Sequence, residues 1–259
     1  MFRAATLAAF VAVVSAQSLS TECTNALAGV AADPAASTCL SVGSLLPLLT
    51  QGASASVIAP INTWLTSLCG SPACSNETLA SVVQNLTAGC STELSGIGFT
   101  SDSTPQVTSI VQQYYPTVRK VVCLKDGDTN CITQTLTNIE GSVGTLSFNN
   151  ILQIIANPPD NLPSNISCTN CVKEAYNVIS TDVPSIVSDA DPALQSQCGA
   201  SFTDGTTPSG ITQSASTADG ATTSTGAALG SVSMLSNGVI AGLGASGLVV
   251  ISTLFTFFA

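Results

Sequence analysis

The sequence predicts an all-α fold, a bundle of about seven to nine short helices stapled by disulfides. Apolar residues recur at steps of three and four along several segments, as they do on one face of a helix. No run alternates convincingly with the period of two that is typical of a strand. The chain also has 10 cysteines, and this even number indicates about five disulfides in a secreted protein.

The clearest apolar stripe lies between residues 105 and 122 and predicts the longest helix. Pro105 suits the first turn of this helix, and Thr104 is the expected N-cap. Pro116 is expected to bend the helix without shifting the stripe. The stripe consists of Val107, Ile110, Val111, Tyr114, Val118, Val121 and Val122.

Four further stripes predict shorter helices. The segment 40–68 is also apolar, although prolines interrupt it. Residues 126–130 are polar instead and predict a turn between two helices, with Asp128 or Thr129 capping the second helix. The four stripes cover residues 79–90, 132–143, 148–155 and 168–187.

The cysteines fall into two sets of similar spacing. Each set follows the pattern C, C, C-x(2–4)-C, C, which raises the alternative of two related halves. Because the spacers differ in length, coincidence is the competing explanation. The cysteines are Cys23, Cys39, Cys69, Cys74, Cys90, Cys123, Cys131, Cys168, Cys171 and Cys198.

Helix geometry excludes one pairing. If residues 75–90 form one helix, Cys74 and Cys90 are about 24 Å apart at a rise of 1.5 Å per residue. A disulfide needs Cα atoms within about 7 Å of each other. These two cysteines should therefore not pair.

The remaining pairings follow from the predicted turns. An αα-hairpin around residues 126–130 would bring Cys123 next to Cys131, and Cys23–Cys39 would be the counterpart in the first half. Three cysteines then remain in each half. If every thiol is oxidised within the monomer, at least one bridge must join the halves.

Both ends of the chain resemble signals that direct a protein to the cell surface. Residues 1–16 are typical of a secretory signal peptide, with Arg3 in the n-region, an apolar h-region and small residues at the cleavage site. Residues 238–259 are typical of a signal for a glycosylphosphatidylinositol (GPI) anchor, because this tail is apolar, uncharged and preceded by small residues. Asn237 is the preferred attachment residue and 226–228 the alternative. A single-pass membrane protein without a cytoplasmic tail is the competing interpretation.

Between these ends we expect a cysteine-rich ectodomain, residues 17–204, and a stalk, residues 205–237. The stalk is rich in Ser, Thr and Gly and has few apolar anchors, so it is expected to be disordered and O-glycosylated. Sequons for N-glycosylation begin at Asn76, Asn85 and Asn165.

The charge balance excludes several functions. The chain has 15 acidic and 5 basic residues, so it offers no cationic surface for nucleic acid. It has no histidine, which removes Ser-His-Asp and Cys-His nucleophiles and histidine-based zinc sites. No cofactor and no metal site are expected.

One local cluster combines cations with aromatic residues. Tyr114 and Tyr115 precede Arg119, Lys120 and Lys125 in the sequence. The cluster suggests a binding patch for an anionic or sugar partner. The competing interpretation is favourable placement of cations at the C-terminus of a helix.

The segments 114–126, 168–171 and 197–202 carry a resemblance to a known family. They read Tyr-Tyr-Pro-Thr-Val-Arg-Lys-Val-Val-Cys-Leu-Lys-Asp, Cys-Thr-Asn-Cys and Gln-Cys-Gly-Ala-Ser-Phe. In these segments the chain resembles fungal, basidiomycete-type, secreted and GPI-anchored cysteine-rich proteins. The resemblance covers residues 23–204 and implies the surface location and the disulfides, but no activity.

Three functional hypotheses remain. The first is a non-enzymatic cell-surface or cell-wall domain, held to the membrane by a lipid anchor, whose partner is a wall polysaccharide or a surface protein. The second is a secreted helical protein that binds a lipid or another small apolar ligand. The third is an enzyme that uses paired carboxylates, for which no pair stands out in the sequence.

Overall fold

A computed structural model describes most of the predicted ectodomain. It confirms the helical fold: the described residues form 11 α-helices, eight of them with seven or more residues, and a small three-stranded sheet that the sequence did not predict. The signal peptide, the helix predicted at 148–155 except for residue 150, and the anchor signal lie outside the described residues. The described residues are 20–45, 47–48, 51–52, 54–95, 99, 101–147, 150, 163–187 and 190–217.

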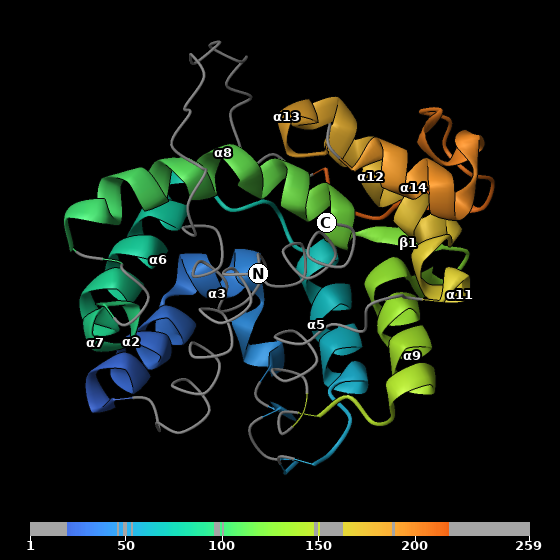
Figure 1. Cartoon of the computed structure of the whole chain (residues 1–259). Coiled ribbons are helices and arrows are strands. Elements are labelled where there is room, and N and C mark those ends of the chain that lie inside the picture. Colours follow the sequence, from blue (N-terminus) through green and yellow to red (C-terminus); the bar gives the residue numbers. More distant parts are fainter. Residues whose placement is uncertain are drawn as a thin grey trace, which may run out of the picture.

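The first group of helices comes from residues 21–95 (Figure 1). Helices α2 and α6 pack against each other, and α6 also packs against α8. Side chains of Ser20, Asp33 and Ser75 each accept a hydrogen bond from a backbone N–H three residues later, which fixes where α2, α3 and α6 begin. The elements are α2 (Thr21–Ala32), α3 (Pro34–Leu40), η1 (Val42–Leu45), α5 (Ile58–Gly70), α6 (Asn76–Gly89) and α7 (Ser91–Ser95).

Helix α8 (Thr104–Val122) is the longest element and connects the two groups of helices (Figure 1). Its stripe packs against α6 near Val107 and reaches the central core at Val121 and Val122. Pro116 lies inside the helix, as predicted. The expected Thr104 cap is wrong: Thr104 is already helical, and its hydroxyl donates to the hydroxyl oxygen of Thr87. Residues Ser101–Ser103 form the short η2 in front of the helix.

A three-stranded antiparallel sheet follows α8. Its strands are β1 (Leu124–Asp126), β2 (Thr129–Asn130) and β3 (Ile211–Gln213), in the order β2-β1-β3. Gly127 turns the β1–β2 hairpin at a φ of 57°, which glycine adopts without strain. Strands of two or three residues are too short to show an alternating pattern, so periodicity does not predict them.

The second group of helices comes from residues 131–203. The single stripe predicted at 168–187 is divided, because Pro184 cannot continue a helix and Val183 before it has left the helical conformation, with φ −144° and ψ 65°. The capping prediction for Asp128 or Thr129 is also wrong: the side chain of Asn130 accepts from the first N–H groups of α9. The elements are α9 (Cys131–Val143), α11 (Ser164–Ser167), α12 (Asn170–Asp182), α13 (Pro184–Val187), α14 (Asp191–Cys198) and η3 (Ala200–Thr203).

Two apolar clusters form the centre of the core. One surrounds α12 and includes Val172, Tyr176 and Phe202. The other lies where α5, α8 and α9 meet and includes Trp64 and Ile132. Among the helices of the described ranges, none is long and apolar enough to cross a membrane.

The ordered domain extends beyond the boundary expected at residue 204. Residues 205–217 lie on the domain, and β3 within this segment pairs with β1. The expectation of disorder from residue 205 is therefore wrong for these residues. Composition predicts disorder here because the segment is polar. The bonds that order it are made to residues far away in the sequence, and composition does not report such bonds.

Candidate functional site

All ten cysteines are paired, and no thiol is free. The expected absence of a Cys74–Cys90 bridge is confirmed, and so is the expectation that at least one bridge joins the halves. The joining bridge is Cys69–Cys123. The five bridges are Cys23–Cys90, Cys39–Cys74, Cys69–Cys123, Cys131–Cys171 and Cys168–Cys198.

The predicted Cys123–Cys131 bridge is wrong. Cys123 packs in the cluster of α5, α8 and α9, whereas Cys131 packs in the cluster around α12. The β1–β2 hairpin between them places the two side chains in these different clusters. Cys69 and Cys171 are therefore the partners that lie within bonding distance.

The predicted Cys23–Cys39 bridge is wrong as well. Cys23, in the first turn of α2, pairs with Cys90 at the end of α6, because α2 and α6 lie side by side. Cys39 pairs with Cys74 instead. The bridges are thus nested in the first half and interleaved in the second, so the similar spacing of the halves does not correspond to a repeated connectivity.

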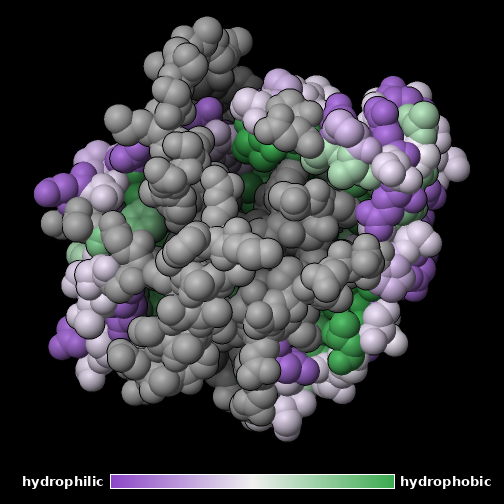
Figure 2. Space-filling model, viewed as in Figure 1, coloured by the Kyte–Doolittle hydropathy of each residue, from purple (hydrophilic) through white to green (hydrophobic). Residues whose placement is uncertain are grey.

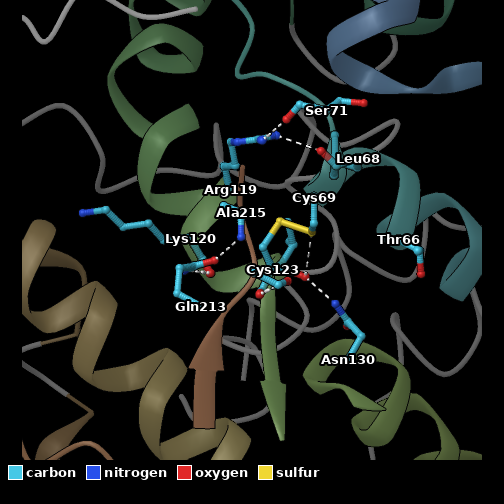
Figure 3. The surroundings of a disulfide bond; sticks show 12 residues. Thr66, Leu68, Cys69, Ser71, Arg119, Lys120, Cys123, Asn130, Gln213 and Ala215 are labelled. Atoms are coloured by element: carbon cyan, nitrogen blue, oxygen red, sulfur yellow. Dashed lines mark hydrogen bonds between the residues drawn. A yellow bond between two sulfur atoms is a disulfide. The ribbon is translucent and has the colours of Figure 1, made fainter. Parts of the chain in front are cut away.

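The Cys69–Cys123 bridge joins the C-terminal ends of α5 and α8 (Figure 3). Arg119 lies beside it with only 6% of its surface exposed. Its guanidinium donates to the carbonyl oxygen of Leu68 at 3.0 Å and to that of Ser71. Arg119 therefore satisfies carbonyl groups at the C-terminus of α5, where a cation is favourable. We call this arrangement of bridge and guanidinium the junction.

The structure does not bring the five patch residues together on one open surface. The hydroxyl of Tyr115 accepts a hydrogen bond from the backbone N–H of Cys74 at 3.0 Å. The side chain of Tyr115 packs against the cluster around the Cys39–Cys74 bridge. Arg119 belongs to the junction. These two side chains therefore serve the fold, as the competing interpretation anticipated for the cation, although the helix end that Arg119 stabilises is that of α5.

Of the other three patch residues, Lys120 is the most exposed. The ammonium of Lys120 forms an ion pair with Asp182 at 2.8 Å, and its side chain is 51% exposed. Lys125 lies in β1 and Tyr114 in α8, and both are half-buried. Lys120 thus ties α8 to the end of α12 while remaining in contact with solvent.

Residues 205–217, the C-terminal strap, cross the junction. Ser214 donates from its backbone N–H (2.9 Å) and its hydroxyl (2.6 Å) to the carbonyl oxygen of Cys123. The N–H of Ser216 donates to the carbonyl of Cys69 at 2.7 Å. Between them Ala215 packs against the cluster that holds both cysteines, as Figure 3 shows. Sequence reasoning missed the strap because no local pattern reports bonds to residues so distant in the chain.

Polar bonds also hold the beginning of the strap and the turn before it. The ammonium of Lys173 bonds to Asp204 at 2.8 Å and to the hydroxyl of Thr206 at 3.1 Å. The Lys173 hydrogen bond, followed by those from Thr206, holds the pKa of Asp204 well below its ordinary value. Asn177 donates to the carbonyl of Thr206 at 3.0 Å. The start of the strap is therefore bound to α12 as well.

The three predicted sequons lie on helices. Asn76 and Asn85 are exposed on α6, and Asn165 is exposed on α11. Their exposure is compatible with a glycan on each side chain. Asn237, the expected anchor residue, lies outside the described residues.

One group of side chains has the spacing of a metal site in the described part of the chain. It consists of Cys23, Cys90 and Glu93. The two sulfur atoms are bonded to each other and so cannot act as thiolate ligands. Glu93 instead accepts from the backbone N–H of Ser20 at 2.7 Å, and this bond lowers the pKa of the carboxyl group. The group therefore anchors the start of α2.

Comparison of the chain with protein-family models, with curated proteins and with solved structures finds no match. The best-defined feature of the structure is the junction with the strap across it.

Proposed function

We propose that this chain is a non-enzymatic cell-surface domain, carried on a stalk and held at the outer face of the membrane or in the cell wall by a GPI anchor. The observation that carries this proposal is the pairing of all ten cysteines in five bridges. Disulfides in such number indicate an oxidising, extracellular compartment. A domain that is cross-linked in this way suits a structural or recognition role at a surface.

The two ends of the sequence support the same location. Residues 1–16 would direct the chain to secretion, and residues 238–259 would be replaced by the lipid at Asn237, with 226–228 as the alternative attachment site. Residues 218–237 would then remain as the stalk. The strap would be the point at which the stalk joins the domain.

The charges of the domain favour one kind of partner. Of its cations, Arg119 is buried, while Lys120 and Lys173 form ion pairs with Asp182 and Asp204. Few positive charges are left to attract an anionic ligand. We therefore propose a neutral wall polysaccharide or another surface protein as the partner.

The polarity of the surface agrees with this choice. On the face drawn in Figure 2, much of the coloured surface is hydrophilic and the hydrophobic areas are small and separate. The large apolar side chains exposed in the described part are Leu27, Val143 and Ile186, which lie on three different helices. A surface of this kind suits contacts with hydroxyl-rich ligands.

The location can be tested in a yeast that expresses the full chain with an epitope tag inserted after residue 17. Phosphatidylinositol-specific phospholipase C should release the tagged protein from intact cells. A matched variant that lacks residues 238–259 should be found in the medium without the enzyme. Retention after treatment, together with detection of Phe258 in the mature protein, would refute the anchor.

The released protein also distinguishes the two kinds of binding. Native mass spectrometry should show the mass of the glycosylated domain alone, while pull-down with wall glucan or chitin should retain it. A lipid that co-purifies at one molecule per chain would instead support the alternative, a protein that binds apolar ligands.

A further inference from the structure

We propose that the C-terminal strap is a removable cover over the Cys69–Cys123 bridge, and that a pull on the chain beyond residue 217 uncovers this bridge first. The covering role depends only on the contacts of the strap. The pull rests on the proposed function, because an anchored stalk is what would transmit force to residue 217.

The order of the contacts along the strap supports this proposal. Ser216 contacts Cys69, and next come the two bonds from Ser214 to Cys123. Only then does β3 pair with β1, with Thr212 opposite Lys125. Force applied at residue 217 therefore loads the contacts at the bridge before those of the sheet.

The antiparallel pairing makes this release sequential. β3 runs antiparallel to β1 and ends beside the bridge, with Gln213 opposite Leu124, so a pull from its C-terminal end opens one pair of residues at a time. Each hydrogen bond contributes little to stability on its own. The strap can therefore detach while the helices stay folded.

The release has a defined limit. Asp204 and Thr206 are bound to Lys173, and Thr207 donates to Glu174 at 3.2 Å. Phe202, just before them, is buried in the cluster around α12. The free length is thus residues 208–217, which can extend to about 35 Å at roughly 3.5 Å per residue.

Removal of the strap would change the access to one bridge in particular. Cys123 is 0% and Cys69 4% exposed, and Ala215 of the strap packs on their cluster. Ile211 of the strap also packs against the cluster around α12, where Cys168 and Cys198 are half-buried, but the hydrogen bonds of Ser214 and Ser216 go to the carbonyls of Cys123 and Cys69. Since thiol–disulfide exchange depends on access of the thiolate, the cover protects the junction selectively.

The exchange itself needs a thiol, such as a small-molecule thiol outside the cell. Its thiolate attacks one sulfur of the Cys69–Cys123 bridge, the S–S bond breaks, a mixed disulfide forms, and the other cysteine leaves as a thiolate. A second thiol molecule attacks the mixed disulfide, releases the second cysteine and forms the disulfide of the reagent. The remaining four bridges stay within their own halves, so each half stays cross-linked after this cut.

The cover is tested with the full chain carrying Ser214→Pro and Ser216→Pro, which removes both backbone donors at the bridge. Ser209→Ala, an exposed strap residue away from the bridge, is the control. Protein is treated with dilute dithiothreitol, quenched with an alkylating reagent at intervals, and each cysteine is quantified by mass spectrometry. Cys69 and Cys123 should react at least about tenfold faster in the double variant, as expected for the loss of three hydrogen bonds.

The Cys168–Cys198 bridge provides an internal standard. In all three proteins it should be reduced first and at the same rate. An unchanged rate at Cys69–Cys123 in the double variant would overturn the cover. Faster reduction of all five bridges in both the double variant and the milder Ser214→Ala variant would also overturn the cover, because the effect would then not be local.

The pull is tested by optical tweezers on the full chain, held at its two ends under oxidising conditions. The first event should lengthen the chain by no more than about 35 Å and should be absent from the double variant. A first event that is longer, or that persists in the variant, would refute the order of release. Failure of the phospholipase test would remove the biological source of force and leave both of these results valid.

Discussion

A close contact between α2 and α6 predicts the effect of a single added methyl group. Gly89 is the last residue of α6, next to Cys90, and it faces Ala26 of α2. A Cβ added at Gly89 would lie 2.3 Å from the Cβ of Ala26 and 3.2 Å from the carbonyl oxygen of Glu22. Carbon atoms in ordinary contact are about 3.5–4.0 Å apart. Gly89→Ala therefore requires α2 and α6 to separate locally by more than about 1 Å.

The surroundings oppose that separation. The Cys23–Cys90 bridge holds the two helices with Cα atoms 4.2 Å apart, directly beside the contact. Overpacking of this kind costs about 1–3 kcal/mol. Alanine gains at most about 0.5–1 kcal/mol over glycine in a helix, and less at its last residue. We expect a net loss of about 1–2 kcal/mol in the free energy of unfolding.

Trp64, the single tryptophan, reports unfolding in guanidinium chloride because it is buried beside the junction. At about 2–4 °C per kcal/mol, Gly89→Ala should also lower the Tm by about 2–8 °C. The matched control is Gly141→Ala in α9, where an added Cβ meets nothing within 4 Å and stability should rise slightly. A double-mutant cycle of Gly89→Ala and Ala26→Gly should show a favourable coupling of at least about 1 kcal/mol, because the second substitution removes the clash. Equal stability of the two alanine variants would refute the contact argument.

Three further predictions concern polar groups. Arg119→Met should lower the free energy of unfolding by about 3 kcal/mol in chemical denaturation, since two carbonyls at the C-terminal end of α5 lose a charged donor. Lys120→Met should lower it by less than about 1 kcal/mol, and equal losses in the two variants would contradict the junction. Asn130→Ala should cost about 1 kcal/mol through the lost cap of α9, and Asp128→Ala almost nothing, which thermal unfolding of both variants decides. Burial and the bond to a carboxylate raise the pKa of Tyr176 to about 12, so its contribution is complete below pH 10 and is lost between pH 10 and about 12; Tyr176→Phe should flatten this part of the stability curve, and an unchanged slope would count against the shift.

The sequence predicted those parts of the fold that depend on local pattern. The helices α6, α8 and α9 were expected because their apolar stripes are long enough to show a period. The cap of α9 is Asn130, one or two residues after the expected Thr129 or Asp128, because these residue types have similar capping tendencies and Thr129 lies in the short strand β2.

The parts that depend on distant contacts were beyond local reasoning. Local reasoning pairs Cys123 with Cys131, the next cysteine in the sequence. The directions of the helices in space decide the partner instead, and they bring Cys69 next to Cys123. Arg119 was one of five residues in a candidate patch, and only the path of α5 reveals that it is buried. The strap was expected to be disordered because its composition is polar. The bonds from Ser214 and Ser216 that order it go to Cys123 and Cys69, which are far away in the sequence.

The most direct test of this account is a non-reducing peptide map of the mature protein, with free thiols blocked before digestion. The account predicts no alkylated cysteine and a peptide pair linked through Cys69 and Cys123, the bridge that joins the halves beneath the strap. A Cys123–Cys131 linkage, or a bridge between the two sets of cysteines that leaves Cys69 and Cys123 with other partners, would contradict the junction and the role proposed for the strap.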